Sequence, residues 1–498
     1  MSLSVLTPVF VLLASAVPSF FIFFLDDRRE KLRITLYLGG EVLKFALVLV
    51  MLRGIYLQES YETRVPLLPG IDFVLRANAL SMLFLVLSAG LWFVTTLYSI
   101  GYLRSDPHRA RFYGFFGLSV TSTAGIALAG NLFTFFIFYE MLTLATYPLV
   151  VHRDTPDAMA AGRKYMAYTL IGGQVFLAGI VALQIVAGPV EFDAGGVISG
   201  GEASRGVLVL IFALLIAGLG VKTALVPLHS WLPAAMVAPT PVSALLHGVA
   251  VVKAGAFGVL RVVYEVYGIE LGRDLGVLLP LALVASFTII YGSLRALAQD
   301  ELKKLLAYST VSQVSYIVLG ASLLGFLDSV GALAHLVHQG IMKVTLFFCA
   351  GIIAQTLGIY NIGKMDGVAR RLPLTMVAFS LAAFGMIGLP PLAGFVSKWY
   401  LGVGAVQGGQ PWAVAVLATS TLLNAAYFLP VVYRAWFKEP PAEWQEKRPR
   451  TRFEADWLLL FPTLAVAVLI LLVGLFAGLE VSPLRWARLV ASREWNLD

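Results

Sequence analysis

The fold class of this chain is decided by residues 113–151, YGFFGLSVTSTAGIALAGNLFTFFIFYEMLTLATYPLVV. The stretch carries a single charged side chain, Glu140, and a helix needs only about 20 apolar residues to cross the hydrocarbon core of a bilayer. There is therefore room for two crossings, with the predicted turn at Gly130–Asn131. The stretch lacks the alternating apolar and polar pattern of a membrane β-barrel, so the predicted elements are helices.

The rest of the chain is similarly apolar. Of its 498 residues, 59% are hydrophobic and only 13% are charged, whereas about a quarter of the residues in a soluble domain are charged. Because such a surface cannot be kept in water, the bilayer is expected to be the solvent of this protein. The predicted fold is a single all-α, polytopic membrane domain over residues 1–498, with about 14 transmembrane helices at 4–25, 34–52, 78–100, 113–130, 131–151, 165–187, 206–228, 243–264, 275–296, 304–324, 330–356, 373–400, 411–434 and 456–479.

The composition excludes several classes of function. The single cysteine, Cys349, excludes a disulfide framework and a cysteine-ligated iron–sulfur cluster. The net charge of +7 does not indicate nucleic-acid binding, because membrane proteins concentrate Lys and Arg in cytoplasmic loops. No glycine-rich nucleotide loop, redox-cofactor ligand set or quinone site is evident, so no cofactor is expected. Residues 3–25 lack a preceding basic region and a cleavage site, so they are expected to remain as the first helix.

The distribution of positive charge predicts the topology. The loops that follow odd-numbered helices hold about 22 Lys and Arg residues and the opposite side holds about 9, and such an excess marks the cytoplasmic side. Both termini are therefore expected to lie outside.

Ten ionisable side chains stand inside the predicted helices. Each costs on the order of 2.5–3.5 kcal/mol at the centre of a bilayer on insertion scales. We therefore expect them to face the protein interior or a hydrated cavity and to mark an ion pathway. They are Lys44, Lys222, Lys253, Lys343, Lys398, Glu41, Glu140, His247, His335 and His338.

Two of the predicted helices are interrupted by proline, in LVPLHSWLP (225–233) and GLPPLAGF (388–395). Broken helices occur in membranes only where the freed backbone groups are buried or hydrated. A matching pair of broken helices is typical of inverted repeats around a transport site. Lys222 precedes the first break and Lys398 follows the second. The two predicted inverted repeats, of five helices each, span 113–264 and 275–434.

The lone carboxyl group of Glu140 is expected to pair with Lys222. A static buried ion pair that fixes helix packing is one interpretation. In the other, making and breaking the pair moves a proton on or off Lys222, because desolvation and an opposite charge shift a lysine in opposite directions. His247 and Lys253 are six residues apart, roughly 120° around an ideal helix, and are expected to reach a common file of water. Both residues also have a structural interpretation: His247 as a polar residue whose hydrogen bonds are satisfied, and Lys253 as a hydrogen-bond donor.

His335 and His338 are neighbours on one helix face, and histidine exchanges protons readily near neutral pH. Lys343 is offset from His335 by roughly 80°. No carboxylate or cysteine lies close in sequence to complete a metal site with the two histidines, so no metal is expected. Glu41 and Lys44 are three residues apart and are expected to form a structural pair.

Five motifs carry a resemblance to a known family. Their order and spacing over about residues 75–435 resemble the antiporter-like subunits shared by respiratory complex I, Mrp-type cation/proton antiporters and membrane-bound hydrogenases. The motifs are FIFYEMLTLATYPLV, GVKTALVPLHSWLPAAMVAPTPVSALLHGVAVVKAG, LAQDELKKLLAYSTVSQVSY, HLVHQGIMKVTLFFCAG and GLPPLAGFVSKWYL.

The resemblance implies a fold of fourteen helices in which helices four to eight and nine to thirteen form the two inverted repeats. The chain lacks the long lateral helix of the largest members, which favours the D-type Mrp subunit or its hydrogenase and complex I counterparts. The implied proton pathway runs from the glutamate of helix five to the lysine of broken helix twelve, through Glu140, Lys222, His247, Lys253, His335, His338, Lys343 and Lys398.

The expected function is proton translocation, with protons passing from Glu140 and Lys222 to Lys398. The expected partners are the lipid bilayer and other membrane subunits of a complex in a prokaryotic plasma membrane. Alternatives are a structural scaffold subunit, a sodium-conducting subunit and an independent solute permease. Sodium prefers oxygen ligands, of which an embedded set rich in lysine offers few. Whether an ion gradient or a redox-driven oxidoreductase supplies the energy, and from which side protons enter, the sequence leaves open.

Overall fold

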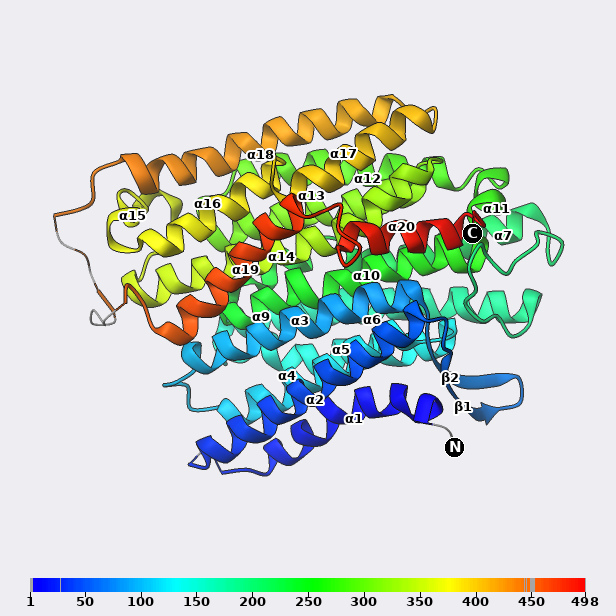
Figure 1. The fold of residues 1–498 in the computed structure, drawn as a ribbon, viewed down its shortest axis with the longest axis horizontal. Coiled ribbons are helices and arrows are strands. Elements are labelled where there is room, and N and C mark those ends of the chain that lie inside the picture. Colours follow the sequence, from blue (N-terminus) through cyan, green and yellow to red (C-terminus); the bar gives the residue numbers. More distant parts are fainter. Residues whose placement is uncertain (1–2, 27, 443, 445, 448–452, 498) are drawn as a thin grey trace.

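The structure is a computed structural model that describes residues 3–26, 28–442, 444, 446–447 and 453–497. Long helices lie side by side in one bundle (Figure 1). The helices are α1 Leu3–Phe23, α2 Glu30–Tyr56, α3 Ala79–Tyr102, α4 Arg109–Leu128, α5 Leu132–Val150, α6 Pro156–Ala187, α7 Arg205–Thr223, α8 Trp231–Ala234, α9 Thr240–Ala244, α10 Val251–Leu260, α11 Ile269–Asp274, α12 Leu278–Leu297, α13 Leu302–Ser322, α14 Phe326–Leu357, α15 Val368–Arg371, α16 Pro373–Ile387, α17 Ala393–Gln407, α18 Trp412–Phe437, α19 Trp457–Leu475 and α20 Pro483–Glu494. The remaining elements are strands β1 Tyr61–Leu68 and β2 Ile71–Ala77, 3₁₀ turns η1 Ala235–Val237 and η4 Ile362–Lys364, and π-helical segments η2 Leu245–Val249 and η3 Arg261–Tyr267.

Twelve helical stretches of the described chain are long and apolar enough to cross a membrane. This confirms the predicted fold class, an all-α polytopic membrane protein. The count of about 14 crossings and the inverted repeats remain predictions. At the other two predicted positions lie α4, which is less apolar, and the pair α16 and α17, each of 15 residues. Arg448, Arg450 and Arg452, which contribute to the last basic loop, lie outside the described residues.

Both predicted helix breaks are present. The helix α7 ends at Thr223, where Ala224 takes a left-handed conformation, and α8 begins only at Trp231. The second break separates α16, which ends at Ile387, from α17, which begins at Ala393. Proline inside each segment removes a backbone donor and clashes with the preceding turn, which disfavours a regular helix there.

The eighth predicted helix is not regular. It spans Thr240–Tyr267 at the centre of the bundle, and no other candidate span is as completely buried among the described helices. Two π-helical segments, η2 and η3, interrupt it, and the amide of Ala250 bonds the carbonyl of Leu245, five residues back. The angle of roughly 120° expected between His247 and Lys253 assumed an ideal helix. The structure corrects that expectation, because each π turn holds an additional residue and changes the direction of the side chains after it.

The β1–β2 hairpin and α20 were not predicted. The hairpin defines one end of the bundle, called here the hairpin end, where α1 begins and α20 ends; α15 lies at the opposite end (Figure 1). The strands pair antiparallel from Tyr61 opposite Ala77, with an irregularity near the turn. Alternating apolar and polar residues around Pro69–Gly70 are the sequence signal that could have found the hairpin.

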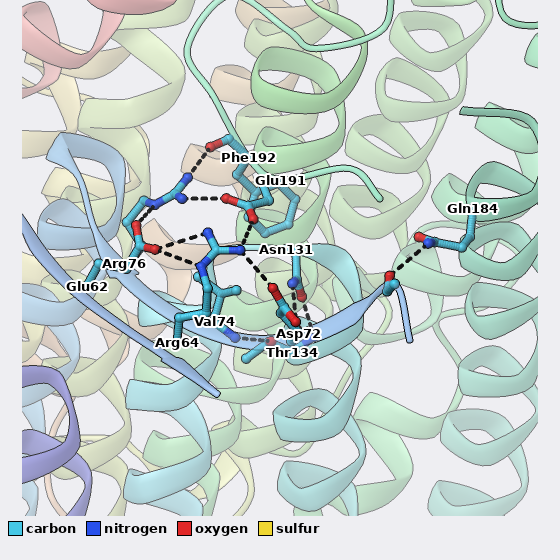
Figure 2. A network of polar contacts seen from close by, with 11 residues as sticks. Glu62, Arg64, Asp72, Val74, Arg76, Asn131, Thr134, Gln184, Glu191 and Phe192 are labelled. Carbon is cyan, nitrogen blue, oxygen red and sulfur yellow. Dashed lines mark hydrogen bonds and ion pairs between the residues drawn. The ribbon is translucent and has the colours of Figure 1, made fainter. Parts of the chain in front are cut away.

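Ion pairs fasten the hairpin to the loop between α6 and α7 (Figure 2). Arg64 contacts Asp72 at 2.9 Å and Glu191 at 2.6 Å, and Arg76 contacts both Glu62 and Glu191. The hydrogen bond from Arg64, supported by Arg76, lowers the pKa of Glu191 below its usual value. Glu191 is therefore charged at neutral pH and holds the hairpin against the helix bundle.

Candidate ion pathway

Eight of the ten ionisable residues predicted within helices, those of the implied pathway, lie on five elements of the bundle. Glu140 comes from α5, Lys222 from the last turn of α7, and Lys398 from α17. The other residues of the pathway come from the helical span Thr240–Tyr267, called here the central helix, and from α14. These residues, like Lys222, are completely excluded from solvent; they are His247, Lys253, His335, His338 and Lys343. Glu140 and Lys398 are only partly buried. The set is therefore closed in the middle and more open at its two ends.

Glu140 and Lys222 are near each other but do not form the direct ion pair that the sequence suggested. The ammonium group of Lys222 donates to the backbone carbonyl of Tyr139 and lies 3.4 Å from the centre of its ring. The carboxyl oxygen Oε1 of Glu140 is buried without a hydrogen-bond partner in the described part of the chain. The two ionisable groups act on each other electrostatically. A pair held apart in this way can change its protonation without breaking a fixed salt bridge.

Glycine residues make this arrangement possible. A Cβ atom at Gly173 of α6 would lie 2.3 Å from Oε1 of Glu140, so the carboxylate occupies space that a larger residue would fill. A Cβ atom at Gly255 would lie 2.4 Å from the amide nitrogen of Thr223. The central helix therefore packs directly against the end of α7, next to Lys222. The indole of Trp231 donates to the carbonyl of Val221 at 2.7 Å and satisfies one group freed by the helix break.

We expect Gly173→Ala to slow proton translocation by about tenfold, a factor that corresponds to about 1.4 kcal/mol in the barrier. The added methyl group pushes the Glu140 carboxylate away from its present position, because the two would overlap. The measurement is proton flux through the assembled complex in vesicles that contain a pH-sensitive dye. Gly402→Ala on α17, where nothing lies within 4 Å of the new Cβ, is the matched control. Equal fluxes in the two variants would contradict the importance of the Glu140 position.

Lys253 joins the central helix to α14. Its ammonium group donates to the carbonyl of Leu336 at 2.7 Å, between the two histidines of that helix. The charge of Lys253 acts on His335, His338 and Lys343. These four residues, which come from two separate sequence motifs, therefore form one electrostatic group.

His335 continues from this group toward the second helix break. Its Nδ1 lies 2.8 Å from the hydroxyl of Ser397, the residue before Lys398, and its ring stacks on Tyr316. The ammonium group of Lys398 lies 5.2 Å from the centre of the Tyr316 ring and donates to the carbonyls of Met386 and Ile387 at the end of α16. Lys343 points elsewhere, toward Leu306 and Ser309 of α13.

Several buried polar atoms near this group lack protein partners. Among the described residues these include both imidazole nitrogens of His247 and both amide atoms of Gln313 and Gln339. A buried polar group without a partner costs about 1–3 kcal/mol, and internal water is the usual means of satisfying it. The interior between the central helix, α13 and α14 is therefore suited to hold water between the ionisable groups.

The remaining sequence candidates lie away from this group. Glu41 and Lys44 are buried in α2, but they do not form a direct ion pair, and the Lys44 ammonium has no hydrogen-bond partner in the described chain. Their structural role stays a prediction. His229 lies 7% exposed at the first break, with its ring 5.1 Å from that of Tyr291.

Lys303, Arg261 and Glu265 are among the buried charged groups that the sequence analysis missed. Lys303, assigned to a loop from sequence, is buried and donates to the carbonyls of Met236 and Ala238 behind the first break. Arg261 and Glu265 form a buried ion pair within the central helix. Their spacing of four residues in an apolar segment is the signal that could have found them.

Comparison with known proteins gives consistent matches over most of the chain. Residues 129–424 match the family described as NADH:quinone oxidoreductase/Mrp antiporter, and residues 70–113 match the N-terminus of chain 5 of NADH-ubiquinone oxidoreductase (complex I). The chain is 35% identical to NADH-quinone oxidoreductase subunit N of Desulforudis audaxviator, over 82% of each chain. It is 26% identical to the D-type component of the Na(+)/H(+) antiporter of Bacillus subtilis, over 82% of this chain and 81% of that protein. It is 30% identical to hydrogenase-4 component B of Escherichia coli, over 80% of this chain and 62% of that protein.

Two solved structures share the fold. A chain of the Mrp complex from Dietzia sp. superposes with a TM-score of 0.87 at 24% identity, covering 100% of this chain and 98% of that one. A chain of the archaeal membrane-bound sulfane sulfur reductase superposes with a TM-score of 0.87 at 23% identity, covering 98% of each.

Proposed function

This chain belongs to the NADH:quinone oxidoreductase/Mrp antiporter family of membrane proteins, and from this premise we propose that it moves protons as an antiporter-like subunit of a multisubunit membrane complex. The observation that carries the proposal is the buried group centred on Lys253. It joins two helices through the Leu336 carbonyl and lies within electrostatic reach of three further ionisable side chains.

The proton route proposed from this geometry has three stages. A proton is exchanged at Glu140 and Lys222, whose charges are coupled without a fixed salt bridge. It then passes between Lys253, His247 and the ionisable residues of α14 through water-assisted transfers. The third stage leads from His335 past Ser397 to Lys398. Each change of charge biases the next, because charges interact strongly where the dielectric constant is low.

The orientation and the repeats belong to the same proposal. The basic loops that follow the odd-numbered members of the fourteen predicted helices gather at the end of the bundle opposite the hairpin (Figure 1). We assign that end to the cytoplasm. The hairpin, the start of α1 and the end of α20 then lie outside. The two broken helices support inverted repeats at 113–264 and 275–434, each containing one break.

The decisive experiment uses the complex that contains this chain, purified with its membrane partners and reconstituted into vesicles with an enclosed pH-sensitive dye. A sodium or potassium gradient, or in separate samples an electron donor, should change the pH inside. Which of the two works identifies an antiporter or a redox-driven pump. A protein that changes the internal pH under neither condition is not a proton-translocating subunit. If variants of the pathway residues assemble and change the internal pH as the wild type does, the result favours a structural scaffold subunit.

A further inference from the structure

The hairpin end of the bundle contains a polar hollow that no stage of the proposed route uses. Its three adjoining parts measure about 420, 420 and 300 Å³. Asn78 and Arg493 line two of them, Asp193 links the first to the second, and Arg76 links the second to the third. Glu62, Arg76 and Glu191 also line the hollow, and Figure 2 shows the ion pairs of Arg76 with the two glutamates. We call this hollow the hairpin-end vestibule.

A buried charge pair lies under the vestibule. The amide of Asn78 donates to the carboxylate of Glu265 at 2.6 Å, and Glu265 is completely buried. Glu265 pairs with Arg261, which also donates to the hydroxyl of Ser81 at 2.7 Å and the carbonyl of Ala127 at 3.1 Å. This pair belongs to η3, so it lies on the same central helix as Lys253.

Glu494 forms part of the wall of the vestibule. It ends α20, is only 5% exposed, and accepts a hydrogen bond from the amide of Gly195 at 3.2 Å. Burial, followed by the negative charge of Glu265, raises the pKa of its carboxyl group well above the usual value. Asp193 adds to this effect, whereas Arg261 opposes it. Arg493 lines the same part of the hollow. The carboxyl group therefore keeps its proton at pH values where an exposed glutamate has lost it.

Polar groups continue inward from Glu494. The indole of the next residue, Trp495, donates to the hydroxyl of Ser329 on α14 at 3.1 Å. Asp328, beside it, is completely buried, and neither of its carboxyl oxygens has a hydrogen-bond partner in the described chain. His335 follows Asp328 by seven residues, or about 10 Å along the helix, on nearly the same face. Buried ionisable groups near the vestibule thus lie on the same two helices as His335 and Lys253.

We propose that the hairpin-end vestibule is a proton port of this chain. The carboxyl group of Glu494 gives its proton to water in the vestibule, leaving a carboxylate, and takes one up in reverse. Asp328 and the Glu265–Arg261 pair carry the charge change toward His335 and Lys253. The inference rests on the proposed function, since a port requires a protein that moves protons. The proposed route ends at Lys398, and the vestibule would give it a second opening, beside the central helix.

The test uses the assembled complex in vesicles of known orientation, with a pH-sensitive dye inside and a pH step applied to the hairpin face. Glu494→Gln should slow the flux at least tenfold and remove its dependence on the pH of that face. The dependence on the pH of the opposite face should remain. Glu494→Asp, which keeps a carboxyl group, should recover part of the flux. Glu480→Gln is the matched control, because Glu480 is 73% exposed and pairs with Arg485 at the surface.

Three outcomes decide the proposal. Wild-type flux and an unchanged pH profile in Glu494→Gln would overturn it. The proposal would also be overturned if the proton flux of Glu494→Asp were as low as that of Glu494→Gln. A residue with only a structural role would not respond to the restored carboxyl group. If Glu494→Gln fails to assemble, Asn78→Ala replaces it, since it removes the hydrogen bond to Glu265, and an unchanged hairpin-face profile again overturns the port. Failure of the proposed function is distinct: the wild-type complex then moves no protons from either face.

Discussion

Replacing Lys222 with alanine is expected to lower proton translocation by roughly 100-fold while the protein still inserts and assembles. The ammonium group lies completely buried, held by the carbonyl and ring of Tyr139 and coupled to the charge of Glu140. Without it, a proton must cross this part of the interior with no group to accept it. The cost of an unaccommodated charge at mid-membrane is on the order of 2.5–3.5 kcal/mol, which corresponds to a rate factor of roughly 100. The measurement is dye-monitored proton flux through the reconstituted complex.

Two further variants make the Lys222 result specific. Glu140→Gln removes the opposite charge with little change in volume and should produce a similar loss. Lys31→Ala, at an exposed position of α2, removes a lysine outside the route and should leave the flux unchanged. Normal flux in both Lys222→Ala and Glu140→Gln would refute the proposed first stage. If these two variants fail to assemble while Lys31→Ala assembles normally, the result supports a structural role of Glu140 and Lys222 in helix packing.

Replacing Lys398 with alanine is expected to have an effect of similar size at the other end of the route. Its ammonium group donates to the carbonyls of Met386 and Ile387, which the second helix break leaves without helical partners. It also faces the Tyr316 ring on which His335 stacks. The substitution therefore removes the last ionisable group and lowers the flux by roughly 100-fold, by the same mid-membrane cost. Loss of donors to the two carbonyls should also lower the thermal stability of the purified complex.

The Lys398 variant separates a conducting subunit from a scaffold. A scaffold predicts either unchanged flux or failure to recover the partner subunits by affinity purification. A conducting subunit predicts an assembled complex with little flux. Lys438→Ala, at an exposed position directly after α18, is the control for the loss of a lysine. Ser397→Ala should have a smaller effect, because it removes only the hydroxyl next to His335 and leaves every charge in place.

The helical crossings and both breaks could be predicted because they depend on local properties. An apolar run of about 20 residues is long enough to cross the bilayer, and proline removes a backbone donor and clashes with the preceding helical turn. The burial of the embedded lysines followed from the same reasoning, and Lys222 and Lys253 are indeed completely buried. The hairpin and α20 were missed because their residues satisfy neither the length nor the apolarity of a membrane crossing.

The sequence by itself determined that this protein is a helical membrane protein with ionisable groups in its interior. Only the tertiary structure decided which of those groups meet. Lys222 bonds the carbonyl of Tyr139, 83 positions away, rather than the carboxylate of Glu140, and Lys253 reaches Leu336 across the same separation. The π-helical segment η2 changes the direction of Lys253 relative to His247, and the buried Arg261–Glu265 pair of η3 lies under a vestibule built from distant loops. Hydrophobicity and helix breaking act within about 20 consecutive residues, whereas contacts between side chains depend on how separate helices rotate and pack against each other.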